Sequence, residues 1–333
     1  MPMSSTATSK LSVLIVGCGQ IAGGYDADHD DALVRTHAKA LTRHGGFRLA
    51  ACVDPDAERR GGFRRRWGVA EDFAGLDAVA ERRFDLACLC SPPEFHAAQL
   101  DTLLAMDVGM VFCEKPLTAA IAESRRLVAA YAAKGRPLAV NYLRRWDPAV
   151  AELAAEIAAG HWGGLLSAEG LYTKGIFANG SHLIDLAHCL LGPLAPRGVT
   201  RVVADYLPHD PTLEGWLHTA TGAPLYLRAG DCRRFTVFEL DLLFEAGRVS
   251  FTESGFTIRR RRVVPDARFD GYRVLEAGES RPTGLGTAML DAVGNLHRHH
   301  LAGEPLASTG VTALAAHDIC AALMGMADDR RTQ

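Results

Sequence analysis

The chain has 333 residues, of which 48% are hydrophobic and 23% charged, so it is long enough for two domains with their own cores. A formal net charge of −3 gives no electrostatic reason to expect nucleic acid or a membrane surface as a partner. Residues 1–10 are small and polar, which predicts a disordered start without a signal peptide. No apolar run is long enough to suggest a membrane span. The eight scattered cysteines predict reduced thiols in the cytoplasm and no metal site.

A glycine-rich turn follows the first predicted strand. Ser12–Val16 is a short apolar run, typical of a buried strand in a parallel sheet. It leads into a G-x-G-x-x-A pattern in which glycine permits a sharp turn and a close approach of backbone amides to a pyrophosphate. The sequence therefore predicts a dinucleotide phosphate site made by Gly17, Gly19, Gln20, Ile21 and Ala22.

An acidic residue ends the second predicted strand. Phe47–Val53 leads to Asp54, whose carboxylate can accept hydrogen bonds from the hydroxyls of an adenosine ribose. The same negative charge would repel a 2′-phosphate, so NAD is the predicted cofactor. Arg59 and Arg60 follow closely and leave NADP open as the alternative.

Asp54 comes later than the usual interval of about 20 residues after the glycines. The extra length lies in Gly23–Asp31, with four aspartates, a tyrosine and two glycines. It is interpreted either as a solvated acidic loop or as a lid over cofactor or substrate.

The first part of the chain alternates strands and helices. Strands are expected at 14–16, 49–53, 86–89, 110–113 and 138–140, with helices at 36–43, 57–67, 95–106 and 118–134. This order predicts an α/β fold with a doubly wound parallel sheet, a dinucleotide-binding Rossmann domain over residues 11–145. Ligands of such sheets bind beyond the carboxyl ends of the strands.

The pattern changes after Asp147-Pro148. Helices at 149–159 and 181–191 and a series of strand-like runs between 165 and 264 predict an α/β domain with a mainly antiparallel sheet over residues 146–333. Two helices, at 287–301 and 309–327, close the chain, and they could pack back on the first domain.

Two loops follow strand ends of the first domain. Cys113-Glu114-Lys115-Pro116 places a lysine where its ammonium could stabilise a substrate oxyanion; the alternative is a loop lysine paired with Glu114. Ser91, Pro92 and His96 belong to a rigid turn and helix start that could wall the cofactor, and Glu114 and Lys115 are predicted to border it too.

Further candidates lie beyond the last strand of this domain. Tyr142 and Arg145 suit a sugar or phosphate-bearing ligand, although a salt bridge from Arg145 to Asp147 explains the arginine equally well. His182 begins a helix and could act as a proton acceptor, or it could cap a domain interface. Asp185 lies three residues on and can interact with His182.

Taken together, the chain resembles the Gfo/Idh/MocA family, named for glucose–fructose oxidoreductase and inositol 2-dehydrogenase. The matching motifs are G-C-G-Q-I-A at 17–22, the acid at 54, S-P-P-E-F-H at 91–96, C-E-K-P at 113–116, N-Y-L-R-R-W-D-P at 141–148 and G-S-H-L-I-D-L at 180–186. The resemblance implies a Rossmann domain followed by an α/β domain whose open sheet often serves oligomerisation, so a homodimer or homotetramer is expected.

The resemblance also implies the site. The lysine of E-K-P and the histidine of the later motif are catalytic in the family, which carries over to Lys115 and His182, with Asn179 beside the substrate. Many members have an aspartate four residues before the histidine, where this chain has Ala178. This departure leaves the proton relay to Lys115 and His182 alone, or with support from Asp185.

The expected activity is an NAD(P)-dependent oxidoreductase that transfers hydride between nicotinamide and a carbinol or ketone of a sugar. The N-G-S-H-L-I-D motif and the long acidic loop resemble those of family members associated with bacterial surface-polysaccharide and amino-sugar pathways, and this resemblance implies a nucleotide-linked or amino sugar. Two alternatives remain: a non-catalytic dinucleotide-binding sensor, or an NAD-dependent glycosidase on the same fold.

Overall fold

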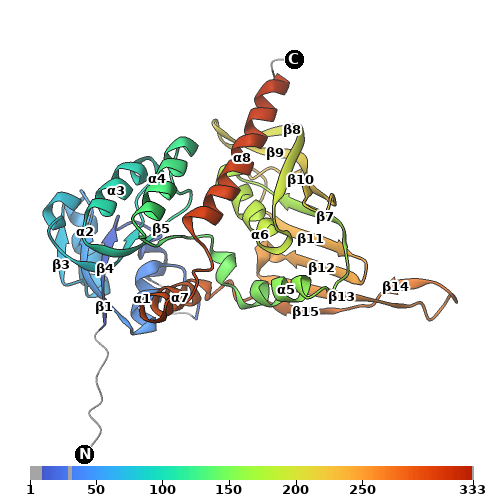
Figure 1. The fold of residues 1–333 in the computed structure, drawn as a ribbon, viewed down its shortest axis with the longest axis horizontal. Coiled ribbons are helices and arrows are strands. Elements are labelled where there is room, and N and C mark those ends of the chain that lie inside the picture. The colour runs from blue at the N-terminus through green and yellow to red at the C-terminus, as the bar shows by residue number, and fades with distance from the viewer. Residues whose placement is uncertain (1–9, 29–31, 332–333) are drawn as a thin grey trace, which may run out of the picture. The chain divides into compact units, whose positions relative to one another are not determined.

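The computed structural model describes residues 10–28 and 32–331, in two compact units (Figure 1). The first unit takes in the chain up to Asn141 together with Gly286–Val311, and the second takes in Tyr142–Leu285 and the chain from Thr312 onward. The start predicted to be disordered, residues 1–9, and the end of the acidic loop, residues 29–31, lie outside the described residues.

The first unit is built on a parallel sheet. Its strands are β1 (Leu11–Val16), β2 (Phe47–Val53), β3 (Glu71–Phe73), β4 (Phe84–Leu89), β5 (Val108–Cys113) and β6 (Leu138–Val140). Their order across the sheet is β3-β2-β1-β4-β5-β6, with every described pair parallel. This confirms the doubly wound fold, and the order reverses between β1 and β4, where such folds bind dinucleotides.

Burial explains why the central strands are mostly apolar. Val13, Leu14 and Ile15 of β1 are completely buried. The strand order runs outward from the centre in both directions, and crossovers between parallel strands are right-handed as a rule, so the helices cover both faces of the sheet. The helices of this unit are α1 (His37–His44), α2 (Ala57–Trp67), α3 (Pro93–Ala105), α4 (Ile121–Ala133) and α7 (Ala288–Ala302), with short 3₁₀ turns η1 (Gly24–Asp26) and η2 (Leu76–Val79). Of the two helices expected to close the chain, α7 packs beside α1 in this unit.

The extra residues interrupt the first turn of the helix that follows β1. The amide of His37 donates to the carbonyl of Ile21 (3.2 Å), and the amide of Ala38 donates to that of Ala22 (2.9 Å). If Arg35 followed Ala22 directly, both bonds would have the i→i−4 spacing of an α-helix. The described residues 23–28 and 32–34 therefore belong to an insertion that separates two parts of one helix.

A buried carboxylate anchors this insertion. Asp26 accepts hydrogen bonds from the Arg35 amide (2.9 Å) and the Thr36 hydroxyl (2.9 Å). Its other oxygen lies 3.0 Å from the Arg35 guanidinium and 3.4 Å from the Lys39 ammonium. Burial alone would raise the pKa of Asp26, but these partners outweigh it and lower the pKa. The described part of the acidic segment is thus tied to α1.

The second unit is built on a large sheet. Its strands are β7 (Leu165–Tyr172), β8 (Leu194–Leu207), β9 (Asp210–Thr219), β10 (Pro224–Ala229), β11 (Phe238–Phe244), β12 (Gly247–Thr252), β13 (Thr257–Pro265), β14 (Arg273–Leu275) and β15 (Glu279–Pro282). The order is β14-β13-β12-β11-β7-β10-β9-β8, with β15 beside β13, and β7 and β10 are the parallel pair. The remaining described pairs are antiparallel, as predicted.

Helices cover one face of this sheet. They include α5 (Pro148–Ala158) and α6 (Ser181–Leu191), with short turns η3 (Leu143–Trp146), η4 (Gly175–Gly180, a π-helix) and η5 (Glu253–Gly255). Gly170 of β7 lies against Leu183 of α6 so closely that a Cβ on the glycine would sit 2.4 Å from the leucine side chain. Strand residues 169 and 171 therefore face away from α6.

The last helix is α8 (Gly310–Arg331). Within the described chain, Gly310–Asp329 is the one helical stretch long and apolar enough to cross a membrane by length and composition, with a mean hydropathy of 1.4. In the structure, 44% of its most apolar window is buried.

Candidate active site

The glycine turn lies at the switch point of the first sheet. Gly17 has a φ of +88°, and a Cβ on it would lie 2.7 Å from the backbone nitrogen of Ser91. No side chain fits there, because the neighbouring strand end is too close. A Cβ on Gly19, by contrast, would meet nothing within 4 Å. The space above Gly19 is open to a ligand, as a pyrophosphate site requires.

The other predicted phosphate-binding residues differ in exposure. Gln20 is exposed, Ile21 is half-buried and Ala22 is completely buried. The Gly19 carbonyl accepts from the amides of Gly23 and Gly24, and the Ile21 and Ala22 carbonyls accept from α1. The turn thus has the hydrogen bonds of a helix amino end, where a phosphate is favoured.

The Asp54 carboxylate is held beside this turn. It accepts from the Cys18 amide (2.9 Å) and the Asp56 amide (2.9 Å), and the Arg59 guanidinium lies 3.4 Å away. Arg59 also pairs with Asp56, at 3.4 Å. Arg60 pairs with Asp72 at 3.1 Å, and its Nη1 lies 3.3 Å from the Asp54 carbonyl oxygen. The end of β2 therefore presents acceptor oxygens, while both following arginines are already engaged by carboxylates.

A cavity of about 580 Å³ adjoins these residues. Its lining includes Gly17, Asp54, Ser91, Pro92 and Phe95. A volume of this size suits an adenosine-sized group. The described residues thus fit a dinucleotide at the site predicted from the glycine pattern.

His96 braces the walls of this region. Its ring, which is completely buried, lies 2.8 Å through Nε2 from the Ser91 carbonyl oxygen and 3.0 Å through Nδ1 from the Pro116 carbonyl oxygen. The histidine therefore joins the turn after β4 to the loop after β5.

Lys115 lies in that second loop, half-buried, directly after Glu114. The Glu114 side chain accepts from Asn141 Nδ2 (2.7 Å), and the same oxygen lies 2.7 Å from His37 Nε2. Burial would raise the pKa of Glu114, but the His37 hydrogen bond and charge, the Asn141 bond and the Lys115 charge together lower it. A carboxylate thus stands beside the lysine.

In the second unit, His182 lies at the first turn of α6. Its ring packs edge-on against Tyr142, with 5.5 Å between ring centroids. Tyr142 is 2% exposed, and burial raises the pKa of its hydroxyl. Within this unit the tyrosine therefore supports the histidine ring.

Arg145 pairs with Asp185. Its Nε lies 2.8 and 3.0 Å from the two carboxylate oxygens, and both side chains are buried. Burial raises the pKa of Asp185 to about 6, against the opposing effect of Arg145. Asp147, the other partner considered for Arg145, instead accepts from the amides of Ala149 and Gly284.

The segment before His182 is held by groups that the motifs did not single out. Asn179 donates through its side-chain amide to the Thr173 carbonyl (3.0 Å). Asp210 of β9 accepts from the amides of Phe177 (2.8 Å) and Ala178 (2.9 Å). Asp210 lies more than 30 residues along the chain from them, so no local pattern could have found it.

Among the residues that the structure describes, no group of three or more His, Cys, Asp or Glu side chains is arranged to hold a metal ion.

The sequence of residues 11–142 matches the family GFO_IDH_MocA, described as an oxidoreductase family with an NAD-binding Rossmann fold. An inositol 2-dehydrogenase from Corynebacterium glutamicum (strain R) is 30% identical over 168 residues, 50% of this chain and 46% of that protein. Another, from Leifsonia xyli subsp. xyli (strain CTCB07), is 30% identical over 224 residues, 66% of this chain and 56% of that protein. The chain spans about half the length of the curated relatives it matches.

Solved structures resemble nearly the whole chain. A levoglucosan dehydrogenase in complex with NADH and levoglucosan has a TM-score of 0.81 at 16% identity, covering 96% of this chain and 98% of that one. The WlbA dehydrogenase from Bordetella pertussis, in complex with NADH and UDP-GlcNAcA, has a TM-score of 0.78 at 17% identity, covering 96% of both chains. At these identities the likeness establishes the fold. Over residues 11–142 the chain is therefore similar to the Gfo/Idh/MocA oxidoreductase family, and those residues have the parallel sheet and glycine turn of a Rossmann fold.

Proposed function

We propose that this protein is an NAD-dependent dehydrogenase or ketoreductase that transfers hydride between the nicotinamide and a carbinol or ketone of a sugar or cyclitol. The observation that carries the proposal is the placement of Lys115, which follows β5 at the sheet edge where the glycine turn and Asp54 also lie. A cation at that edge is close to the reactive end of a dinucleotide bound across the switch point.

In this proposal the pyrophosphate binds to the turn made by Gly17, Gly19, Gln20, Ile21 and Ala22. The adenosine ribose binds to Asp54. Ser91 and Pro92 form a wall of the cavity, and His96 braces that wall. NAD is favoured over NADP for two reasons. The Asp54 charge opposes a 2′-phosphate, and Arg59 is already paired with Asp54 and Asp56. Bound NAD supplies the hydride acceptor.

The catalytic roles follow from the side-chain chemistry. His182 would take the proton from the substrate hydroxyl, and Lys115 would stabilise the oxygen as it gains negative charge. Tyr142 orients the His182 ring. Asp185, Arg145 and Asn179 are engaged in bonds inside the second unit, so we infer that they shape the substrate region by positioning α6 and its approach.

The substrate proposal extends to a nucleotide-linked or amino sugar. Two observations support it: the motif around His182, and a structural relative bound to UDP-GlcNAcA. The inositol 2-dehydrogenases and the levoglucosan complex favour a free polyol or sugar ring as the competing substrate class.

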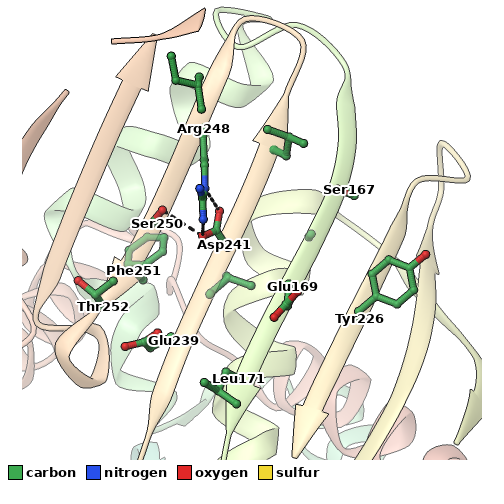
Figure 2. Close-up of a pocket in the computed structure, with 14 residues that line it drawn as sticks. Ser167, Glu169, Leu171, Tyr226, Glu239, Asp241, Arg248, Ser250, Phe251 and Thr252 are labelled. Carbon is green, nitrogen blue, oxygen red and sulfur yellow. Dashed lines mark hydrogen bonds and ion pairs between the residues drawn. The ribbon is translucent and has the colours of Figure 1, made fainter. Parts of the chain in front are cut away.

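We also infer a cytoplasmic homodimer or homotetramer assembled through the helix-free face of the second sheet. Figure 2 shows this face, with Tyr226 on β10 and the Arg248–Asp241 ion pair joining β12 to β11. Tyr226 is 48% exposed and Leu243 is 38% exposed, an apolar content that a second copy could cover. All eight cysteines are free thiols, which suits a reducing compartment.

The test is nicotinamide absorbance after inositols, free sugars and nucleotide-linked sugars are added to NAD-loaded protein. Lys115→Met should lower turnover by about 10²- to 10³-fold, because it removes the oxyanion partner. His182→Ala should lower it by about 10²- to 10⁴-fold through loss of the base. NAD binding, followed by protein fluorescence, should persist in both variants, and His161→Ala, an exposed histidine of the same unit, serves as control.

Normal turnover in Lys115→Met would refute the catalytic assignment. No signal with any sugar, and none with NADH and keto-sugars, would favour a sensor, a reading that Ala178 also motivates. Sugar release without net NADH would favour a glycosidase.

A further inference from the structure

We propose that His37 is a positioning residue for hydride transfer, which fixes the Glu114 carboxylate behind Lys115. The inference rests on the proposed function, in which Lys115 acts on the reacting oxygen. It adds a residue that lies just after the insertion, far from the E-K-P motif in sequence.

The geometry is a buried three-residue network within the first unit. His37 Nε2 lies 2.7 Å from Glu114 Oε1, and Asn141 Nδ2 donates to the same oxygen at 2.7 Å. His37 is completely buried and Asn141 is 5% exposed. The Glu114 backbone is fixed separately, since its amide donates to the Leu89 carbonyl at 2.9 Å. His37 therefore fixes the orientation of the Glu114 side chain, whereas the backbone conformation of the loop does not depend on it.

The ring is used at one nitrogen. His37 Nδ1 is buried and has no hydrogen-bond partner, and the ring packs on Phe112 with 4.8 Å between centroids. A buried polar atom without a partner is destabilising, and an apolar residue would fill this space without one. The hydrogen bond between His37 Nε2 and Glu114 offsets the destabilisation caused by the unsatisfied Nδ1.

The backbone of the same residue reaches the phosphate turn. The His37 amide donates to the Ile21 carbonyl, and the preceding Thr36 and Arg35 are tied to Asp26. One residue thus joins the proposed pyrophosphate site to the loop that carries Lys115. The insertion is anchored so that α1 still begins with this histidine.

The consequence for Lys115 is electrostatic. The titratable groups facing Glu114 are His37 on α1, Lys115 on its own loop, and three buried thiols. These are Cys88 on β4, Cys90 just after β4 and Cys113 at the end of β5; burial raises their pKa values, so that they stay uncharged. His37 contributes the largest lowering of the Glu114 pKa. Without His37 the pKa of Glu114 would be higher, so Glu114 would protonate at higher pH and lose the negative charge beside Lys115.

The first experiment measures the Glu114 titration directly, by carbon NMR of protein labelled at the glutamate carboxyl carbon. The Glu114 resonance is identified by its absence in Glu114→Gln. We expect His37→Leu to raise its midpoint by about one pH unit or more. His37→Gln, whose side-chain amide can still donate, should retain most of the wild-type midpoint. His44→Leu, on the last turn of the same helix, is the matched control. An unchanged midpoint in His37→Leu overturns the inference.

The second experiment follows kcat against pH. In His37→Leu the acid limb should move to higher pH by the same amount as the NMR midpoint, with the KM for NAD within about twofold of wild type because the phosphate turn keeps its backbone bonds. The double variant His37→Leu/Glu114→Gln should show no additional shift over Glu114→Gln alone. A loss of kcat that is uniform across pH would mean a purely structural role and overturn the inference. Absence of turnover in the wild type would refute the proposed function, and the NMR titration would then decide the His37–Glu114 coupling by itself.

Discussion

The sequence motif and the structure suggest different partners for Asp185. Its spacing from His182 suggests support for a catalytic base. In the structure its carboxylate instead accepts, through both oxygens, from the single Nε–H of Arg145 in a buried contact. Burial of two charges is expensive, and here it raises the pKa of Asp185 to about 6. The pair therefore fixes η3, which carries Arg145, against α6, which carries Asp185, and it lowers the free energy of unfolding.

The raised pKa of Asp185 predicts that the free energy of unfolding depends on pH. In the unfolded chain Asp185 loses its proton near its ordinary pKa of about 4, whereas in the folded protein it keeps the proton until about pH 6. The folded state binds more protons in that window, so this group's contribution to the free energy of unfolding is present below about pH 4 and lost as pH rises to about 6. The loss is of order 3 kcal/mol.

Urea unfolding at a series of pH values tests this predicted loss of stability. The wild type should lose this stability relative to Asp185→Asn, which has no carboxyl to titrate, between about pH 4 and about pH 7. Asp107→Asn, at an exposed position, should keep the wild-type slope. Parallel curves for wild type and Asp185→Asn would mean that Arg145 keeps the carboxylate ionised throughout.

At the scale of elements, the insertion at residues 23–34 is the feature that sets this Rossmann domain apart from the expected spacing. The bonds from His37 to Ile21 and from Ala38 to Ala22 keep the helix hydrogen-bonded across the interruption. Joining Ala22 directly to Arg35 should therefore yield a continuous helix and a folded protein.

The shortened protein should be less stable by about 3 kcal/mol, because Lys39, 5% exposed, loses the Asp26 carboxylate that neutralises it. Adding Lys39→Leu to the shortened chain should restore most of the loss. The measurement is urea unfolding, with NAD binding as a check on the phosphate turn. Failure of both shortened chains to fold would contradict the view that the segment is looped out of one helix.

For the molecule as a whole, the second sheet has helices on one face and a helix-free face on the other. Tyr226→Glu together with Leu243→Glu should convert the proposed oligomer to monomer, since two buried charges would oppose association. Light scattering after size-exclusion chromatography measures the mass. Phe235→Glu, at an exposed aromatic outside this face, is the control, and an unchanged mass in the double variant would place the interface elsewhere.

Local pattern was sufficient for most of the scaffold. The run before Gly17 is apolar because β1 is covered on both faces, and the glycines are required by a positive φ and a close neighbouring strand. Asp54 and Lys115 could be proposed because each directly follows a strand, and the carboxyl ends of parallel strands share one edge. These features depend on residues adjacent in sequence.

The sequence by itself therefore determined the alternation of elements, the parallel sheet and the dinucleotide turn, since each follows from periodicity and from glycine stereochemistry. Only the tertiary structure decided which polar groups meet: His37 with Glu114, Asp26 with Lys39, Arg145 with Asp185, and Asp210 with the amides before His182. The partners in these contacts lie between 13 and 77 residues apart. Such contacts leave no periodic signal in the sequence. They depend on the order of the strands in the sheet and on the position at which the chain rejoins the helix after the insertion.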